Sequence, residues 1–433
     1  MTSEVIIANS QGIAMAADSA VTINGQKIYN SALKLFSLSK FAPIGVMIYG
    51  GAALAGAPWE TIIKVFRHEL GQKKLDTLNE YALAFIAHIN SYPYWHSDSD
   101  KLQVGRAIHT VFSTLLSNLE NKVSLHFKDN EALSDDQTNQ FLKEIIENFS
   151  ATAIADNNFL DGYSKKSIST IKKVYTDELK NSREAVFSKF NLDTRTISSL
   201  YNCVIHLLIT ETFNESQISG IVIAGYGQRE IYPNVITFEF DGILEQRPRV
   251  RINKDKTKSL DANDCTILAF AQEDMVMTFM CGLNPSIQAF LYENLSTILG
   301  RIPEIISDDF LAGDDETKRS IREHITKEIA GLNEKSREDL GHFIQDQQIS
   351  PIMNLTSSLP KDELAAMAES LINLTAFKRK MSDTLETVGG PIDVAVISKG
   401  DGLVWVRRKH YFPRELNSGY FGTYFYGYDH EER

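Results

Sequence analysis

Three residues near the start of the chain, Thr2, Asp18 and Lys34, are of types that could together perform nucleophilic chemistry. A threonine with a free amine carries a hydroxyl nucleophile and, on the same residue, a base whose ordinary pKa is about 7.7–8.0. A nearby lysine would lower the pKa of that amine, and a carboxylate would orient the lysine. Thr2 follows Met1 directly, so we expect removal of Met1 alone to expose both groups. The alternative is that Asp18 and Lys34 form only a structural ion pair.

A tetrahedral intermediate formed at Thr2 would also need a backbone N–H to stabilise its oxyanion. The apolar run at residues 44–49 ends at Gly50-Gly51, where the end of a strand could leave such an amide unpaired. We expect Gly50 to supply this N–H, with Gly51 as the alternative.

The elements that would position these residues are readable from hydrophobic periodicity. Apolar runs at residues 4–9 and 13–17 around a polar turn predict a β-hairpin, and residues 34–38 and 44–49 predict two more strands. Residues 58–71 show helical spacing of apolar side chains, with Pro58 at the first helical position.

Helical and strand patterns alternate along the remainder of the chain. Helical patterns fill residues 75–213 and 268–385, while residues 219–226 and 231–240 predict strands followed by a turn at Asp241-Gly242. Residues 389–408 predict a closing hairpin with its turn at 400–402. This order favours an α+β fold, a sandwich of two sheets with helices outside. We expect six parts, which are sandwich segments 2–74 and 214–303, helical insertions 75–213 and 304–350, a last helix and hairpin 351–408, and an aromatic tail 409–433.

Residues 2–56 resemble the start of a proteasome β-type subunit, a member of the N-terminal-nucleophile (Ntn) hydrolases. That family has an aspartate sixteen residues after its N-terminal threonine and a lysine sixteen residues further on, and Thr2, Asp18 and Lys34 repeat this spacing without a gap. Residues 222–242 and 389–402 are similar to the central and last hairpins of the family.

The resemblance implies a four-layer α-β-β-α sandwich and a threonine-type peptidase that needs no metal or cofactor. Thr2 would attack a peptide carbonyl with its own amine as base, Lys34 would tune that amine, Asp18 would hold Lys34, and Gly50 would bind the oxyanion. The positions of the substrate pocket are apolar, which implies cleavage after apolar residues; they fall on Val21, Ala32, Ile48 and Ala52.

The resemblance also implies partners. We expect a polypeptide substrate, assembly into a homo-oligomer, and an ATP-dependent unfoldase as an optional partner. The aromatic segment 420–428 is suited to docking on another subunit. A net charge of −12 disfavours nucleic acid and anionic membranes, and three cysteines in 433 residues favour a reducing compartment, so we expect a cytoplasmic protein.

The chain departs from the family just before Gly389-Gly390. An aspartate and a serine that buttress the threonine in the family fall here on Leu385 and Val388, with Asp383, Thr384 and Thr387 as nearby substitutes. Two other functions therefore stay open: an Ntn-type amidase acting on a small molecule, and a proteasome-like scaffold that has lost its activity.

Three other patterns have simpler explanations. Cys203 and His206 form a C-x-x-H half-site without a second half, which disfavours a metal site. The acidic residues Asp255, Asp261 and Asp264 lack the glycine and glutamate of a calcium loop, so we interpret them as a solvated turn. The basic run 407–410 is expected to be a polar strand end rather than a nucleic-acid site.

Overall fold

The fold is mixed α+β and is built around two antiparallel sheets, as the sequence predicts. The computed structural model describes residues 2–23, 27–91, 97–129, 134–215, 218–305, 314–382, 388–410 and 412–418. The expected substitutes Asp383, Thr384 and Thr387, the position Leu385 and the aromatic segment 420–428 lie outside these ranges. No helix within them is long and apolar enough to cross a membrane.

The first sheet has the strand order β13-β1-β2-β14-β15 and carries the start of the chain. Its strands are β1 (Ser3–Asn9), β2 (Gly12–Ala17), β13 (Cys265–Ala271), β14 (Asp393–Ser398) and β15 (Gly402–Arg407). The predicted first hairpin is present, because β1 and β2 pair in a register that sets Asn9 opposite Gly12. β1 is flanked by β13 on its other side, so the first described residues begin inside a sheet.

The second sheet has the strand order β11-β10-β9-β6-β5, with the short β12 paired to β10. Its strands are β5 (Leu35–Ser37), β6 (Ile44–Gly50), β9 (Ser219–Gly225), β10 (Asn234–Leu244), β11 (Arg247–Ile252) and β12 (Lys258–Ser259). Two small ribbons stand apart, formed by β3 (Val21–Ile23) with β4 (Lys27–Tyr29) and by β7 (Ala53–Leu54) with β8 (Ala57–Pro58).

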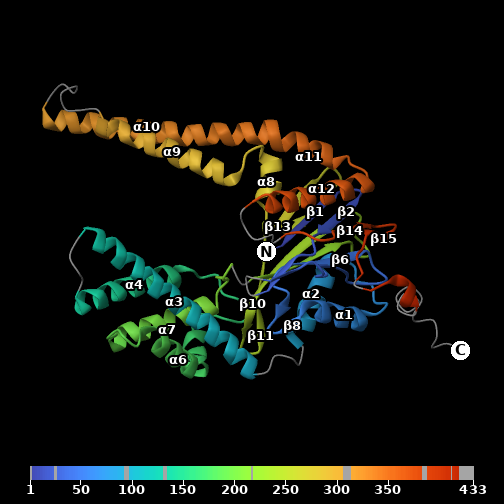
Figure 1. Cartoon of the computed structure of the whole chain (residues 1–433), viewed down its shortest axis with the longest axis horizontal. Helices are drawn as coiled ribbons and strands as arrows, with labels where there is room; N and C mark the ends of the chain where they lie inside the picture. The colour runs from blue at the N-terminus through green and yellow to red at the C-terminus, as the bar shows by residue number, and fades with distance from the viewer. Residues whose placement is uncertain are drawn as a thin grey trace.

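The two sheets pack face to face, and helices cover their outer faces (Figure 1). Side chains of both sheets form the core between them, including Ile6, Met15, Met47 and Val222. The first sheet is covered by α8 (Asp274–Cys281), α11 (Ser350–Ser357) and α12 (Lys361–Lys380). The second sheet is covered by α1 (Trp59–Leu70) and α2 (Leu78–Ser91).

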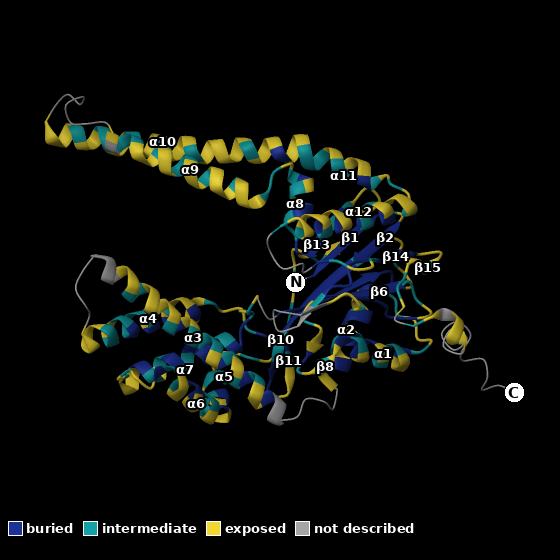
Figure 2. Cartoon of the chain, in the orientation of Figure 1, coloured by how far each residue is buried: buried dark blue, intermediate teal, exposed yellow. Residues whose placement is uncertain are grey.

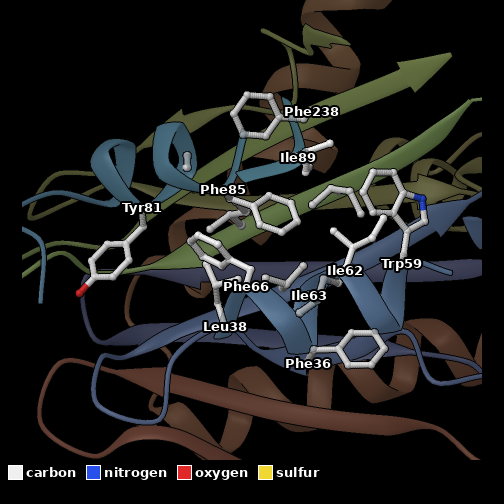
Figure 3. Close-up of a cluster of buried hydrophobic side chains, with 14 of the residues drawn as sticks. Phe36, Leu38, Trp59, Ile62, Ile63, Phe66, Tyr81, Phe85, Ile89 and Phe238 are labelled. Carbon is white, nitrogen blue, oxygen red and sulfur yellow. The ribbon is translucent and has the colours of Figure 1, made fainter. Parts of the chain in front are cut away.

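The core between the second sheet and its helices is rich in aromatic side chains (Figure 3). Trp59 lies against Phe240 with ring centroids 4.8 Å apart, and Phe66 meets Phe85 edge to face at 5.2 Å. Pro58 is the cap that precedes α1 rather than its first residue, with φ −63° and an extended ψ, so the helix starts one position later than predicted.

Two helical regions extend from the sandwich (Figure 1). One has a core of its own and contains α3 (Ser97–Asp129), α4 (Asp135–Ala155), α5 (Ser167–Val174), α6 (Thr176–Phe187) and α7 (Thr194–Leu208). The other is a long hairpin of α9 (Pro285–Ile305) and α10 (Asp315–Ile344), which a π-helical turn at Gln345–Ile349 joins to α11. A short 3₁₀ turn spans Arg414–Leu416.

Two sequence predictions about strands were wrong. The predicted turn at Asp241-Gly242 is a register shift inside β10, where Gly242 has φ +84°; the chain reverses later, at Glu245 and Gln246. The helical block predicted from residue 268 starts only at α8, because residues 265–271 form β13. A short apolar run such as this one fits a strand or a buried helix equally well.

Candidate active site

Thr2 directly precedes β1 and is nearly buried, with 6% of its surface exposed. Its hydroxyl donates a hydrogen bond of 3.2 Å to Oε2 of Glu4, two residues along the chain. Alternate residues of a strand point to the same face, so Thr2 and Glu4 share the face of β1 on which Ile6 and Ala8 enter the core between the sheets. The candidate nucleophile therefore begins the inner face of the first sheet.

Lys34 forms ion pairs that link the second sheet to the first. It directly precedes β5 of the second sheet and is itself nearly buried. Its ammonium forms an ion pair with Asp18 Oδ1 and lies 3.2 Å from Glu4 Oε1. Both carboxylates come from the first sheet region and are fully buried, so one cation faces two carboxylates away from water.

Asp18 is held by four donors. Its Oδ1 accepts the backbone N–H of Ser3 at 3.1 Å as well as the Lys34 ammonium, and its Oδ2 accepts the N–H of Ala20 at 3.3 Å and of Gly389 at 3.0 Å. The carboxylate thus fastens the start of β1 and the segment before β14 to the loop after β2. These four contacts fix the position of the carboxylate that meets Lys34.

The environment of Glu4 strongly perturbs its carboxyl group. Burial raises the pKa of its carboxyl, Lys34 opposes that rise, and the neighbouring Asp18 adds to it, so that the pKa lies at about 7. A buried carboxylate without compensation is costly, and two carboxylates sharing one ammonium are only partly compensated. Glu4 therefore changes its charge near neutral pH.

Glu4 was missed by the sequence analysis, although a signal for it exists. It is the only ionisable residue of β1, whose other residues are Ser3, Asn9 and an apolar run. An acidic residue in a strand that is buried along its whole length needs a partner. The spacing motif directed attention to Asp18 and Lys34, and Lys34 is the ion-pair partner of this glutamate as well as of Asp18.

Gly50 ends β6 in the second sheet and is exposed. Its φ of +71° favours glycine, and a Cβ there would lie 2.2 Å from the carbonyl oxygen of Ile218. The alternative donor Gly51 uses its N–H in a 3.0 Å hydrogen bond to the same carbonyl. Of the two glycines, Gly51 therefore has its N–H in a backbone hydrogen bond between the end of β6 and the segment before β9.

The four positions expected to line a substrate pocket differ in exposure. Ala52 is exposed, while Val21 and Ala32 are half-buried. Ile48 belongs to the core between the second sheet and α1, which makes it a packing residue. The Val388 position, where the family has a serine, is also buried, and the next residue, Gly389, uses both backbone groups to bind Asp18 and Ser19.

The remaining sequence patterns have structural partners. His206 lies 2.7 Å from the carbonyl oxygen of Asp156 through Nε2, and Cys203 is buried in α7. The described part of the chain contains no group of three His, Cys, Asp or Glu residues that could hold a metal ion. In the basic run, Arg407 pairs with Glu369, and Arg408 and Lys409 both pair with Asp393.

Comparison with known proteins gives a distant structural likeness. No protein-family model matches the sequence, and no curated protein matches it. The chain is similar over 98% of its length to the ancestral β-subunit Anbu of Yersinia bercovieri, covering 94% of that chain at 9% identity and a TM-score of 0.29. Anbu of Pseudomonas aeruginosa, described as a helical assembly, gives 8% identity, coverages of 98% and 95%, and a TM-score of 0.28. Anbu of Hyphomicrobium sp. strain MC1 gives 8% identity, coverages of 98% and 94%, and a TM-score of 0.28. At these values the likeness does not establish shared chemistry.

Proposed function

We propose that this chain is an Ntn-type hydrolase that cleaves peptide bonds with Thr2 as its nucleophile. The observation that carries the proposal is the placement of the Thr2 hydroxyl against a buried Glu4–Lys34–Asp18 charge cluster at the start of β1. Buried charges beside a hydroxyl cost stability, and such perturbed clusters concentrate at functional sites. The layers and the sixteen-residue spacings agree with the fold that the resemblance implies.

The reaction begins with attack of Thr2 Oγ on the substrate carbonyl carbon, which gives a tetrahedral oxyanion. The N–H of Gly50 binds that oxyanion, since Gly51 is already bonded to Ile218. The proton of the hydroxyl passes to a neighbouring base, for which the chain offers the α-amine exposed by Met1 removal and the Glu4 carboxylate. Collapse of the intermediate leaves an ester on Thr2, which water then hydrolyses.

Two related functions use the same fold. An amidase acting on a small molecule would share the Thr2 chemistry and differ in its substrate. A scaffold without activity would keep the charge cluster only as a structural ion pair. A buried charge cluster is costly to keep without a use, which disfavours the inactive scaffold. The expected pocket positions are apolar, and for this reason we favour a peptide substrate with an apolar side chain.

Hydrolysis by matched Thr2 variants tests the proposal. A fluorogenic peptide with an apolar residue before the scissile bond is offered to wild type, Thr2→Ala and Thr2→Ser. We expect Thr2→Ala to lose activity by at least about 1,000-fold, because the nucleophile is gone. Thr2→Ser keeps the hydroxyl and is expected to retain measurable activity.

The controls distinguish the three functions. The circular dichroism spectra of the variants should equal that of wild type, since neither change empties the core. Wild-type activity on small amides but not on any peptide would indicate the amidase, and absence of both activities would indicate the scaffold. Equal peptide hydrolysis by wild type and Thr2→Ala would place the chemistry elsewhere.

A further inference from the structure

Glu4 has a geometry that an ion-pair partner of Lys34 does not require. One carboxylate oxygen, Oε1, lies 3.2 Å from the Lys34 ammonium, while the other, Oε2, accepts the hydroxyl hydrogen of Thr2 at 3.2 Å. The carboxylate thus bridges the cation and the candidate nucleophile. Asp18 pairs with the same lysine through Oδ1, but its other oxygen, Oδ2, accepts hydrogen bonds from two backbone N–H groups.

We propose that the Glu4 carboxylate, rather than the α-amine of Thr2, is the base that receives the proton of the Thr2 hydroxyl. The proposal rests on the proposed function of Thr2 as nucleophile. Lys34 fixes the carboxylate through Oε1 and so directs Oε2 at the hydroxyl. Glu4 touches the reacting oxygen and is a catalytic residue, whereas Asp18 and Lys34 position it.

The surroundings of Glu4 suit a base that works near neutral pH. Among the described residues, the charged groups that face it are Lys34 from the segment before β5 and Asp18 from the loop after β2. Removal of Met1 adds the α-amine of Thr2, whose hydroxyl contacts Glu4. Its neighbours on the flanking strands are apolar, Ala17 on β2 and Phe270 on β13. Burial holds the pKa of Glu4 at about 7, close to the value at which a general base is most effective at neutral pH.

Every proton and electron pair of the reaction is supplied by Thr2, Glu4, the substrate or the hydrolytic water. Thr2 Oγ forms a bond to the carbonyl carbon, its proton moves to Glu4 Oε2, and the carbonyl electron pair moves to oxygen. When the intermediate collapses, the C–N bond breaks and the leaving amine takes the proton from Glu4. Water then attacks the ester and gives a proton to Glu4, which returns it to Thr2 Oγ as the acid product leaves.

The pH dependence of hydrolysis in Glu4 variants tests the proposal. We measure kcat/KM for the fluorogenic peptide between pH 5 and 9 in wild type, Glu4→Gln and Glu4→Asp. We expect wild type to lose activity on the acid side with a midpoint near pH 7. Glu4→Gln keeps the shape of the side chain but not the base, so its rate falls about 100-fold or more and the acid limb disappears or moves. Glu4→Asp keeps a carboxylate, but the shorter side chain places it further from the Thr2 hydroxyl. We expect this variant to have a rate between those of wild type and Glu4→Gln and to keep the loss of activity at acid pH.

Two results would overturn the proposal. One is a Glu4→Gln protein as fast as wild type. The other is a slower protein whose acid limb stays at the same pH, since a merely structural glutamate would lower the rate without moving the titration. Activity in Thr2→Ala would instead refute the proposed function, so the two failures are distinguishable.

A second measurement keeps Glu4 intact, and so does not depend on the folding of its variants. A glycine inserted between Met1 and Thr2 leaves one residue ahead of Thr2 after methionine removal and converts its amine into an amide, which is not basic. A β-lactone probe needs only the hydroxyl to acylate Thr2. With Glu4 as base, intact mass shows acylation of the inserted form within about 10-fold of the wild-type rate. Loss of acylation in the inserted form, while wild type still reacts, would assign the base role to the amine.

Discussion

The two buried carboxylates near Thr2 differ in their hydrogen-bond partners rather than in their burial. Asp18 and Glu4 are both fully buried, yet Asp18 accepts hydrogen bonds from three backbone N–H groups, those of Ser3, Ala20 and Gly389. Glu4 has Lys34 and the Thr2 hydroxyl, and its pKa is raised to about 7 by burial. We therefore expect two chemically similar side chains beside one ammonium to have different roles, with Asp18 as a structural anchor and Glu4 as the proposed base.

This difference has a consequence for stability as well as for chemistry. The folded state raises the pKa of Glu4 from 4.5 to about 7, so between these values the folded protein holds a proton that the unfolded chain has released. Stability should therefore fall as the pH rises from about 4.5 to about 7 and level off above, with a slope of at most about 1.4 kcal/mol per pH unit. Urea denaturation at several pH values measures this slope.

The matched variants are Glu4→Gln and Glu60→Gln. Glu4→Gln should flatten the dependence in this window because the titrating group is gone. Glu60 is exposed on α1 and pairs with Lys64, so its replacement should leave the slope as in wild type. An unchanged slope in Glu4→Gln would show that Glu4 does not titrate differently in the folded and unfolded chains.

The sequence predicted only part of this site, for a physical reason. Fixed spacing identified Thr2, Asp18 and Lys34 as a group, and the structure places Asp18 and Lys34 in contact. The sequence could not show that Glu4 contacts the same lysine, because that contact depends on how the two sheets pack. Nor could the sequence show that the N–H of Gly51 is bonded to Ile218, which is the reason that we favour Gly50 as the oxyanion donor.

At the scale of elements, close packing of β6 against β9 positions Gly50. Tyr49 lies opposite Gly220 in this pair and donates its hydroxyl to Glu239 at 2.9 Å. An added Cβ at Gly220 would lie 1.9 Å from the Tyr49 ring. The ring therefore occupies the space that the glycine leaves, directly beside the end of β6.

Gly220→Ala should consequently destabilise the protein by about 1–3 kcal/mol or more, because the ring must move and its hydrogen bond to Glu239 is strained. Gly331→Ala in α10 is the control: no atom lies within 4 Å of an added Cβ there. It should stabilise its helix by about 0.5–1 kcal/mol. Chemical denaturation measures both, and equal effects of the two changes would contradict the packing account.

The strands that a turn signal separates were predictable, and those that depend on tertiary context were not. The hairpin of β1 and β2 follows from its sequence, because a short polar turn divides two apolar runs. β13 pairs with β1 across more than 250 residues of sequence, and nothing local marks its apolar run as a strand. The register shift at Gly242 was mistaken for a turn, because glycine with a positive φ occurs both in β-bulges and in turns.

At the scale of the whole molecule, the α9–α10 hairpin extends beyond the sandwich, and much of it is exposed (Figure 2). The exposed large side chains of α9 are Ile287, Phe290, Leu291, Ile298 and Ile305. A helix that displays this much apolar surface to water tends to associate. In the homo-oligomer that the resemblance implies, we expect α9 to contribute to the contact between copies.

Sedimentation velocity at micromolar concentration tests this assembly. Wild type should sediment as an oligomer, and the double change Phe290→Ser with Ile298→Ser should shift it toward a smaller species because the apolar contact is lost. Ile231→Ser is the control, since Ile231 is 75% exposed and belongs to the connection between β9 and β10 rather than to the hairpin. A wild-type protein that sediments as a single monomer would contradict the proposal.

The central claim, that Thr2 is the nucleophile, is tested most directly by covalent labelling with a peptide epoxyketone. This probe reacts with a hydroxyl and a free amine on the same residue, so one experiment reports the nucleophile and the loss of Met1. Intact mass and N-terminal peptide mapping of wild type should show one adduct, located on Thr2 with Met1 absent, and none on Thr2→Ala. A wild-type protein that hydrolyses peptides but forms no adduct, or an adduct that persists in Thr2→Ala, would contradict the account.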